Sequence, residues 1–151
     1  MAIENGIYEM GLHCLLTVNR PIIDPHYVPS LVDENGKFYS RKEFMNKEIS
    51  IKEAEMELEA QIQLLLSTGL KLNHIDTHHG FMLKSREMFD LFVKLAKKYD
   101  VPLRNEISHE LPEDYQAYRK TGAVFWNAHP YSGKLRLRSF QKEDHRTALS
   151  F

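Results

Sequence analysis

The sequence predicts an α/β fold with parallel strands, and three observations support this prediction. Apolar residues recur at helical spacing over 50–68 and again over 85–99. Short apolar runs of strand length follow these helical segments at 72–77 and 101–105, and helices alternating with strands at such intervals are typical of a parallel sheet. Histidines stand at or near the predicted strand ends, where parallel α/β proteins gather functional groups.

The composition is that of a single globular domain over 1–151. Of the residues, 42% are hydrophobic and 27% are charged. The net charge of −1 leaves no electrostatic footprint for nucleic acid or a membrane surface, so we expect a small neutral substrate. The single cysteine, Cys14, excludes an internal disulfide. No run approaches about 20 apolar residues and the first residues do not resemble a signal peptide, so we expect a cytoplasmic protein.

The first predicted strand covers 11–18, an apolar run that contains one polar residue, His13. A histidine in a buried strand is as often a hydrogen-bonded core residue as a metal ligand. Three prolines then predict an extended loop over 21–30. The pair Asn35-Gly36 predicts a hairpin-like turn within 32–38. Loops of this length at a strand end usually shape a binding rim.

The first long helix is predicted over 50–68. Ser50 is placed to cap its N-terminus in a capping box with Glu53, and Gly69 to end it. Apolar residues at three- and four-residue spacing define a buried stripe. The glutamates of this helix are expected mostly on the solvent side; they are Glu53, Glu55, Glu57 and Glu59.

The strand predicted at 72–77 leads into the most polar stretch of the chain. Because side chains alternate along a strand, His74, Asp76 and His78 are expected to share one face. Unpaired polar groups cost a few kcal/mol each when buried, so this face predicts a site at the end of the strand. The alternative is a surface loop that carries solvated histidines.

After the helix at 85–99 and the short strand that ends in Arg104, the pattern weakens. A short helix is predicted at about 111–120, and a strand at 122–128 leads to His129. The segment 131–151 is basic and loosely patterned, which favours a loosely packed tail over a nucleic-acid patch.

Three strand ends therefore offer histidines, with Asp76 and Arg104 beside them: His13, then His74, His78 and His79, and then His129. Imidazole and carboxylate groups suit a divalent ion such as Zn²⁺, Mg²⁺ or Mn²⁺, which polarises carbonyls and lowers the pKa of bound water, so hydrolysis is the predicted chemistry. Serine-hydrolase, phosphate-loop and dinucleotide-binding motifs are not found in the sequence. The order His-x-Asp-x-His-His differs from the metallo-β-lactamase motif, in which the acid stands elsewhere.

These motifs resemble the YdjC-like carbohydrate deacetylases, the ChbG family. The resemblance is carried by several motifs in the family's order: Gly11-Leu12-His13 with Leu16-Thr17 and Arg20-Pro21, the segment 28–36 with Phe38, the helix that contains Glu57 and Gln61, His74-Ile75-Asp76-Thr77-His78-His79, Pro102-Leu103-Arg104 and His129-Pro130. It implies an incomplete or deformed (β/α) barrel, a divalent metal ion (Mg²⁺ or Zn²⁺) and removal of acetyl groups from N-acetylated sugars of the chitooligosaccharide type. It also implies that His13 and His78 are metal ligands and that His129 is the general acid.

The roles of the remaining candidates stay open between two interpretations each. Asp76 either orients a metal-bound histidine or serves as the catalytic base. Arg104 either binds substrate, as His79 is expected to do, or forms a salt bridge with an acid such as Asp76. Two other functions remain as alternatives: an inactive sugar- or metal-binding remnant, and a metal-dependent phosphoesterase, which should need more carboxylate ligands or a second metal.

The Asn-Ala-Asp-Asp strand that supplies the family's base has no counterpart in this sequence. We therefore expect about four or five strands, a homodimer or a capped sheet edge, and weak or absent metal affinity and deacetylase activity. If His13 and His78 share a metal, their ring nitrogens should lie within roughly 3–4 Å of each other, on parallel neighbouring strands.

Overall fold

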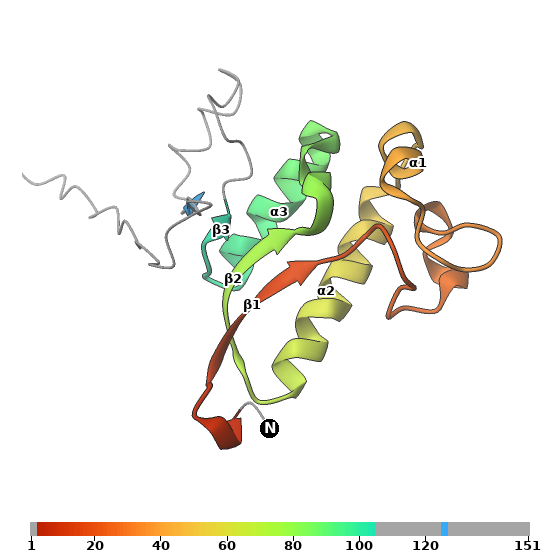
Figure 1. The fold of residues 1–151 in the computed structure, drawn as a ribbon. Helices are drawn as coiled ribbons and strands as arrows, with labels where there is room; N and C mark the ends of the chain where they lie inside the picture. The colour runs from red at the N-terminus through yellow and green to blue at the C-terminus, as the bar shows by residue number, and fades with distance from the viewer. Residues whose placement is uncertain (1–2, 105–124, 127–151) are drawn as a thin grey trace, which may run out of the picture.

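The described residues, 3–104 and 125–126 of a computed structural model, form a parallel sheet with helices packed against it (Figure 1). Strands β1 (Glu9–Cys14), β2 (Lys71–Thr77), β3 (Leu103–Arg104) and β4 (Phe125–Trp126) pair in this order, each parallel to the next. The predicted α/β class with parallel strands is confirmed. The closure of a barrel stays a prediction, because 105–124 and 127–151 lie outside the described residues.

Helices α2 (Ile51–Ser67) and α3 (Arg86–Lys98) pack against each other and against the sheet (Figure 1). Between helices and sheet lies the apolar core, in which aromatic rings of η4 (His78–Lys84) and α3 meet edge to face at Phe81 and Phe92. Removing large apolar side chains from water supplies most of the stabilisation. The largest fully buried members include Phe44, Phe81, Phe89, Phe92, Leu16, Leu58, Ile62, Ile75 and Leu95.

The cap of α2 follows the prediction only in part. The Ser50 hydroxyl accepts from the backbone N–H of Glu53, and Gly69 follows the helix with a φ of 82°. The Glu53 carboxylate, however, accepts from the backbone N–H of Ser30 at 2.7 Å instead of closing a capping box. In a capping box the N–H of Ser50 would donate to Glu53, but here it donates to the Ser30 hydroxyl at 3.0 Å. This tertiary contact holds Ser30, in the segment before α2, against the start of the helix.

Helix α3 matches its prediction closely. Ser85 caps it by accepting from the N–H of Met88, and Tyr99 ends it. Its buried face consists of Met88, Phe89, Leu91, Phe92, Val93, Leu95 and Ala96. On the outer side, Lys94 and Lys98 pair with Glu55 and Glu59 of α2, each at 2.6 Å.

Strand β1 ends at Cys14, whereas the predicted strand covers 11–18. After Cys14 the backbone forms hydrogen bonds with the side chain of Gln61 instead of with a neighbouring strand. The backbone N–H of Leu15 donates to Gln61 Oε1 at 3.0 Å, and its carbonyl accepts from Gln61 Nε2 at 2.7 Å. Val18 and Asn19 then have φ angles of 72° and 70°, which turn the chain away from the sheet. Of the strand's residues only Cys14 is buried, so the prediction of a buried strand was wrong over most of its length.

The loop after β1 contains short helices that the proline pattern did not resolve. They are η2 (Pro25–Tyr27) and η3 (Pro29–Leu31), each with proline in its first turn. The predicted hairpin is confirmed as an antiparallel bridge between Val32 and Phe38. Helix α1 (Arg41–Asn46) was missed, although Ser40 and Glu43 form a complete capping box there; η1 (Ile3–Asn5) begins the described chain.

Glu57 is fully buried and is an exception to the prediction that the glutamates of α2 lie mostly on the solvent side of the helix, whereas Glu53, Glu55 and Glu59 are partly exposed. Its carboxylate accepts from the backbone N–H groups of Ile22 and Ile23, both at 3.0 Å, and from Gln61 Nε2 at 2.8 Å. A carboxylate can be buried when donors replace its hydration. Here it fastens the loop after β1 to the middle of α2.

Several predictions lie outside the described residues. They concern the helix at about 111–120, His129, the tail at 131–151 and most of the strand at 122–128, of which β4 is described. Among the helices that are described, none combines the length and the apolar character needed to cross a membrane.

Candidate metal site at the ends of two parallel strands

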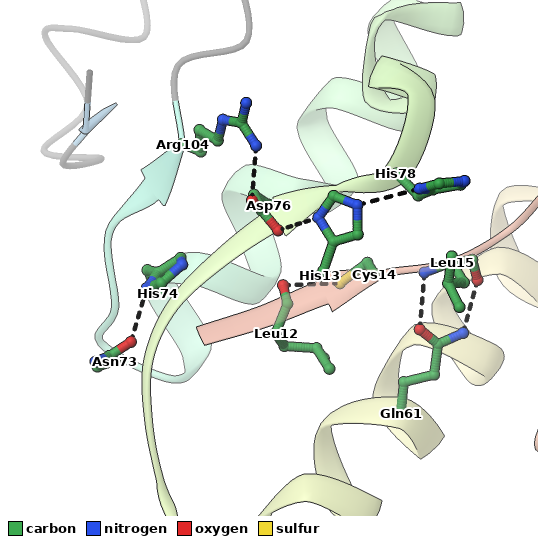
Figure 2. A network of polar contacts seen from close by, with 10 residues as sticks. All are labelled: Leu12, His13, Cys14, Leu15, Gln61, Asn73, His74, Asp76, His78 and Arg104. Atoms are coloured by element: carbon green, nitrogen blue, oxygen red, sulfur yellow. Dashed lines mark hydrogen bonds and ion pairs between the residues drawn. The ribbon is translucent and has the colours of Figure 1, made fainter. Parts of the chain in front are cut away.

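The site is built around the contact between His13 on β1 and Asp76 on β2 (Figure 2). The two residues are register partners in the parallel pair, and His13 Nδ1 lies 2.7 Å from Asp76 Oδ1. Asp76 is buried, with 7% of its surface exposed. Because an ionised carboxylate only accepts, His13 carries its proton on Nδ1, and the lone pair of a neutral ring is on Nε2.

Arg104 holds the other side of the same carboxylate. Its Nη1 donates to Asp76 Oδ2 at 2.9 Å, so each carboxylate oxygen has a partner (Figure 2). Of the two interpretations of Arg104, this is the salt bridge. The geometry of Asp76 is that of an orienting group, since metal-bound imidazoles commonly donate their second N–H to a carboxylate.

His78 faces the free nitrogen of His13. It is the first residue after β2, and its Nδ1 lies 3.2 Å from His13 Nε2, with the rings nearly perpendicular at 83°. The predicted convergence of the two rings, on parallel neighbouring strands, is confirmed. With metal-nitrogen distances of about 2.0–2.1 Å, two tetrahedral zinc ligands stand roughly 3.3 Å apart. The pair thus fits a shared ion, and it also fits an N–H···N hydrogen bond in which His78 Nδ1 donates.

The described residues supply two candidate ligands and no larger cluster. No group of three or more His, Cys, Asp or Glu side chains arranged to hold a metal ion occurs within 3–104 and 125–126. A tight zinc site takes three or four protein ligands. A strongly bound ion would therefore need ligands from other residues of the protein.

Burial is the main cause of a lowered pKa at His78, and the neighbouring His79 and His13 lower this pKa further. Burial also lowers the pKa of His74, where the charge of Asp76 acts in the opposite direction and that of Arg104 in the same one. Both shifts favour neutral imidazole, the form that binds metals.

His79 continues the polar end of β2 in a left-handed conformation. Its φ is 59° and that of Gly80 is 66°, so the chain turns sharply there. The His79 ring lies over that of His78, with centroids 3.7 Å apart, and its Nδ1 is 3.3 Å from the hydroxyl of Thr17. Thr17 is fully buried and ties this turn to the segment after β1.

His74 does not join the other histidines, although the alternation of the strand predicted a shared face for His74, Asp76 and His78. Its Nδ1 bonds Asn73 Oδ1 at 2.7 Å, and its ring occupies the space beside Gly11 (Figure 2). His78 lies beyond the end of β2, where strand alternation no longer applies. Thus His13, from the neighbouring strand, is the histidine that contacts Asp76.

Sequence reasoning assigned no role to the residues that hold the rim in place, namely Thr17, Glu57 and Gln61. The sequence could have indicated that Glu57 and Gln61 are buried, because they are four residues apart and next to Leu58 and Ile62 on the apolar stripe of the helix. Thr17 belongs to the Leu16-Thr17 motif of the family resemblance, but the sequence does not indicate its contact with His79. The position of His129 lies outside the described residues.

Comparison with known proteins places these features in one family. The family model described as YdjC-like protein matches residues 1–149. A carbohydrate deacetylase of Enterococcus faecalis is 37% identical over 108 residues, which is 70% of this chain and 41% of the relative. A carbohydrate deacetylase of Oceanobacillus iheyensis is 40% identical over 102 residues, which is 67% of this chain and 43% of the relative. The chain therefore matches less than half the length of these curated relatives.

A solved structure supports the same assignment. A protein of Enterococcus faecalis assigned to cellobiose-phosphate cleavage superposes with a TM-score of 0.70 at 33% identity, over 78% of this chain and 45% of that protein. The resemblance seen in the sequence motifs is confirmed, and the chain belongs to the YdjC-like family.

Proposed function

We propose that this chain contributes the histidine half of a metal-dependent site that removes acetyl groups from N-acetylated sugars, of the chitooligosaccharide type. The observation that carries the proposal is the 3.2 Å approach of His13 Nε2 to His78 Nδ1, with Asp76 holding His13 in the required tautomer. The curated relatives named carbohydrate deacetylases support the choice of substrate class.

His13 and His78 would hold the divalent ion, Mg²⁺ or Zn²⁺. When bound, such an ion polarises a carbonyl oxygen and lowers the pKa of water. Asp76 keeps the proton of His13 on Nδ1, and Arg104 balances the charge of the buried carboxylate. In the overall reaction, water adds to the acetyl carbon, the carbon–nitrogen bond breaks, and acetate and the sugar amine are released. His129 is proposed as the acid that protonates the departing nitrogen.

The orienting role is also the better proposal for Asp76, because a base must have an oxygen available to accept a proton from water. Both oxygens of Asp76 are engaged, one by His13 and one by Arg104. His79 is proposed to contact the sugar from its exposed position at the turn after β2.

Acetate release from an N-acetylated chitooligosaccharide tests the proposal. With added Zn²⁺ or Mg²⁺ we expect slow release by the 151-residue chain, because the described residues offer two ligands. Chelation, His13→Ala and His78→Ala should each abolish it, whereas His26→Ala, which removes an exposed histidine of η2, should leave it unchanged. Release that persists in His13→Ala would contradict the proposal.

The two alternatives give different results in the same experiment. Metal-dependent sugar binding without acetate release would identify a non-catalytic binding remnant. Faster hydrolysis of a phosphate monoester than of the acetylated sugar would favour the phosphoesterase. Among the described residues one carboxylate, that of Asp76, lies beside the histidine pair, and it is already engaged, which does not support this alternative.

A further inference from the structure

The two candidate metal ligands are held in place by different means. The ring of His13 is fixed by the buried carboxylate of Asp76, 2.7 Å from its Nδ1 (Figure 2). In the described part of the chain, the polar partner of the His78 ring is His13 itself, at 3.2 Å. A histidine side chain rotates about two bonds, so a further contact is needed to set the direction of the His78 ring.

His79 supplies this contact. Its ring lies against the ring of His78, with centroids 3.7 Å apart and an angle of 37° between the two ring planes. The backbone of His79 is left-handed, with a φ of 59°, which is uncommon for a residue other than glycine. Because His79 is exposed, its ring in turn needs a partner that restricts its rotation.

Thr17 is the partner of His79. Its hydroxyl lies 3.3 Å from His79 Nδ1, and among the described residues His79 is the polar side chain that this hydroxyl contacts. Thr17 is fully buried, and a buried hydroxyl without a partner costs free energy, so folding favours the contact. A hydroxyl both donates and accepts, so the contact is compatible with either tautomer of His79.

The position of Thr17 is set by the segment after β1. Both backbone groups of Leu15, two residues earlier, are bonded to Gln61 of α2. The next residue, Val18, has a φ of 72° and turns the chain away from the sheet. Thr17 is therefore anchored through α2, and it meets His79 from outside the turn that follows β2.

We propose that Thr17 is a positioning residue for the histidine pair. By holding the ring of His79 against His78, it directs His78 Nδ1 toward His13 before an ion is bound. Ligands that already point toward one another lose less side-chain freedom when an ion binds, so this arrangement raises metal affinity. The metal role rests on the proposed function, whereas the positions of the rings can be measured without metal and without catalysis.

Nuclear Overhauser measurements on the histidine-labelled 151-residue chain, in the presence of a chelator, test the positioning. The wild-type chain should show contacts between the ring protons of His78 and His79 and between those of His13 and His78. Thr17→Val, which has nearly the same shape but no hydroxyl, should lose most of both contacts. Thr17→Ser, which retains the hydroxyl, should keep them. Contacts that are absent from the wild-type chain, or unchanged in Thr17→Val, would overturn the proposal.

His79→Ala tests the same relation without a substitution in the core. The variant removes a ring at an exposed position, so the fold should be retained. The contact between the rings of His13 and His78 should weaken as it does in Thr17→Val. A full contact in His79→Ala would show that His79 does not direct His78.

Zinc titration distinguishes positioning from a merely structural role. Thr17→Val and His79→Ala should each weaken zinc binding roughly two- to tenfold, the range expected for the loss of one hydrogen bond, and Thr17→Ser should not. Thr68→Val, which removes an exposed hydroxyl at the end of α2, is the matched control and should leave the affinity unchanged. A lower Tm in Thr17→Val with unchanged zinc affinity and ring contacts would assign Thr17 a structural role only and overturn the proposal.

The same variants separate this proposal from the proposed function. If the ring contacts respond as expected and no acetate is released, the positioning role stands and the deacetylase proposal fails. If acetate is released and the ring contacts in Thr17→Val are unchanged, only the positioning role fails.

Discussion

Gly11 lacks a side chain at a point of β1 where the ring of His74 needs the space. A Cβ placed on Gly11 would lie 2.0 Å from Cε1 and 2.1 Å from Nε2 of His74. The register of β1 and β2 also shifts between Met10 and Gly11, which brings Gly11 opposite His74 and His13 opposite Asp76. The close approach at Gly11 is thus part of how the strands align His13.

Gly11→Ala should lower the free energy of unfolding by about 1–3 kcal/mol, because the ring or the strand must shift to admit a methyl group. Urea denaturation measures the change. His74→Ala removes the obstructing ring, so the double variant should lose less stability than the sum of the two single variants. Additive losses would show that the ring is not what excludes alanine at this position.

The histidine rings also make stability depend on pH. The pKa of His74 is lowered in the folded chain, mainly by burial, so protonation favours the unfolded chain. The stability that His74 contributes is complete above its unfolded pKa of about 6.5 and is lost as pH falls through its lower folded pKa.

The free energy of unfolding should therefore decrease as pH falls below about 6.5. His74→Asn should reduce the steepness of this decrease, and urea denaturation between pH 7.5 and pH 5 measures both slopes. His26→Asn, which replaces an exposed histidine of η2, is the control substitution. Equal slopes in the wild-type chain and His74→Asn would contradict the prediction.

At the scale of elements, α2 serves as the anchor for the segment that leaves β1. Gln61 bonds both backbone groups of Leu15, and the buried carboxylate of Glu57 accepts from Ile22 and Ile23. Two side chains one helical turn apart thereby fix the beginning of the loop that carries Thr17. The loop is positioned by side chains because its own backbone forms no strand there.

Glu57→Gln should destabilise the chain by roughly 1–3 kcal/mol, since an amide nitrogen would face N–H donors that now have an acceptor. Glu55→Gln on the same helix removes a partly exposed ion pair with Lys94 and should cost at most about 1 kcal/mol. Both values come from chemical denaturation. A loss for Glu57→Gln no larger than that for Glu55→Gln would mean that the buried contacts do not secure the loop.

At the scale of the molecule, the candidate site joins segments that are 65 residues apart in the sequence. A ligand held by both histidines would stabilise the folded chain, because the unfolded chain does not keep His13 and His78 together. An ion bound by both histidines would therefore depend directly on the pairing of β1 with β2. Among the described strands β1 lies at the edge of the sheet, and a homodimer that covers this edge stays a prediction.

Zinc at about ten times its dissociation constant should stabilise the chain by about 1.4 kcal/mol, or roughly 3–6 °C in Tm. His13→Ala and His78→Ala should each remove this increase, and a chelator should reverse it. His26→Ala is the matched control and should retain the increase. Scanning calorimetry measures it, and an equal rise in His13→Ala would place zinc binding elsewhere.

The sequence by itself determined the elements whose signals are local. Helical spacing predicted α2 and α3, with Ser50 as the cap of α2, and a short apolar run between the two helices predicted β2. The family motifs indicated His13 and His78 as a pair. The predictions of the helices and of β2 succeeded because helix caps, helical periodicity and short apolar runs depend on neighbouring residues, which the sequence displays directly.

Only the tertiary structure decided which polar groups meet. Strand alternation grouped His74 with Asp76 and His78, but the register of the strand pair brings His13 to Asp76 and places His74 against Gly11. Glu57 was expected in solvent and instead binds the loop after β1. Such partners lie tens of residues away, and their energies depend on burial and on distances of about 3 Å, which a one-dimensional pattern does not contain.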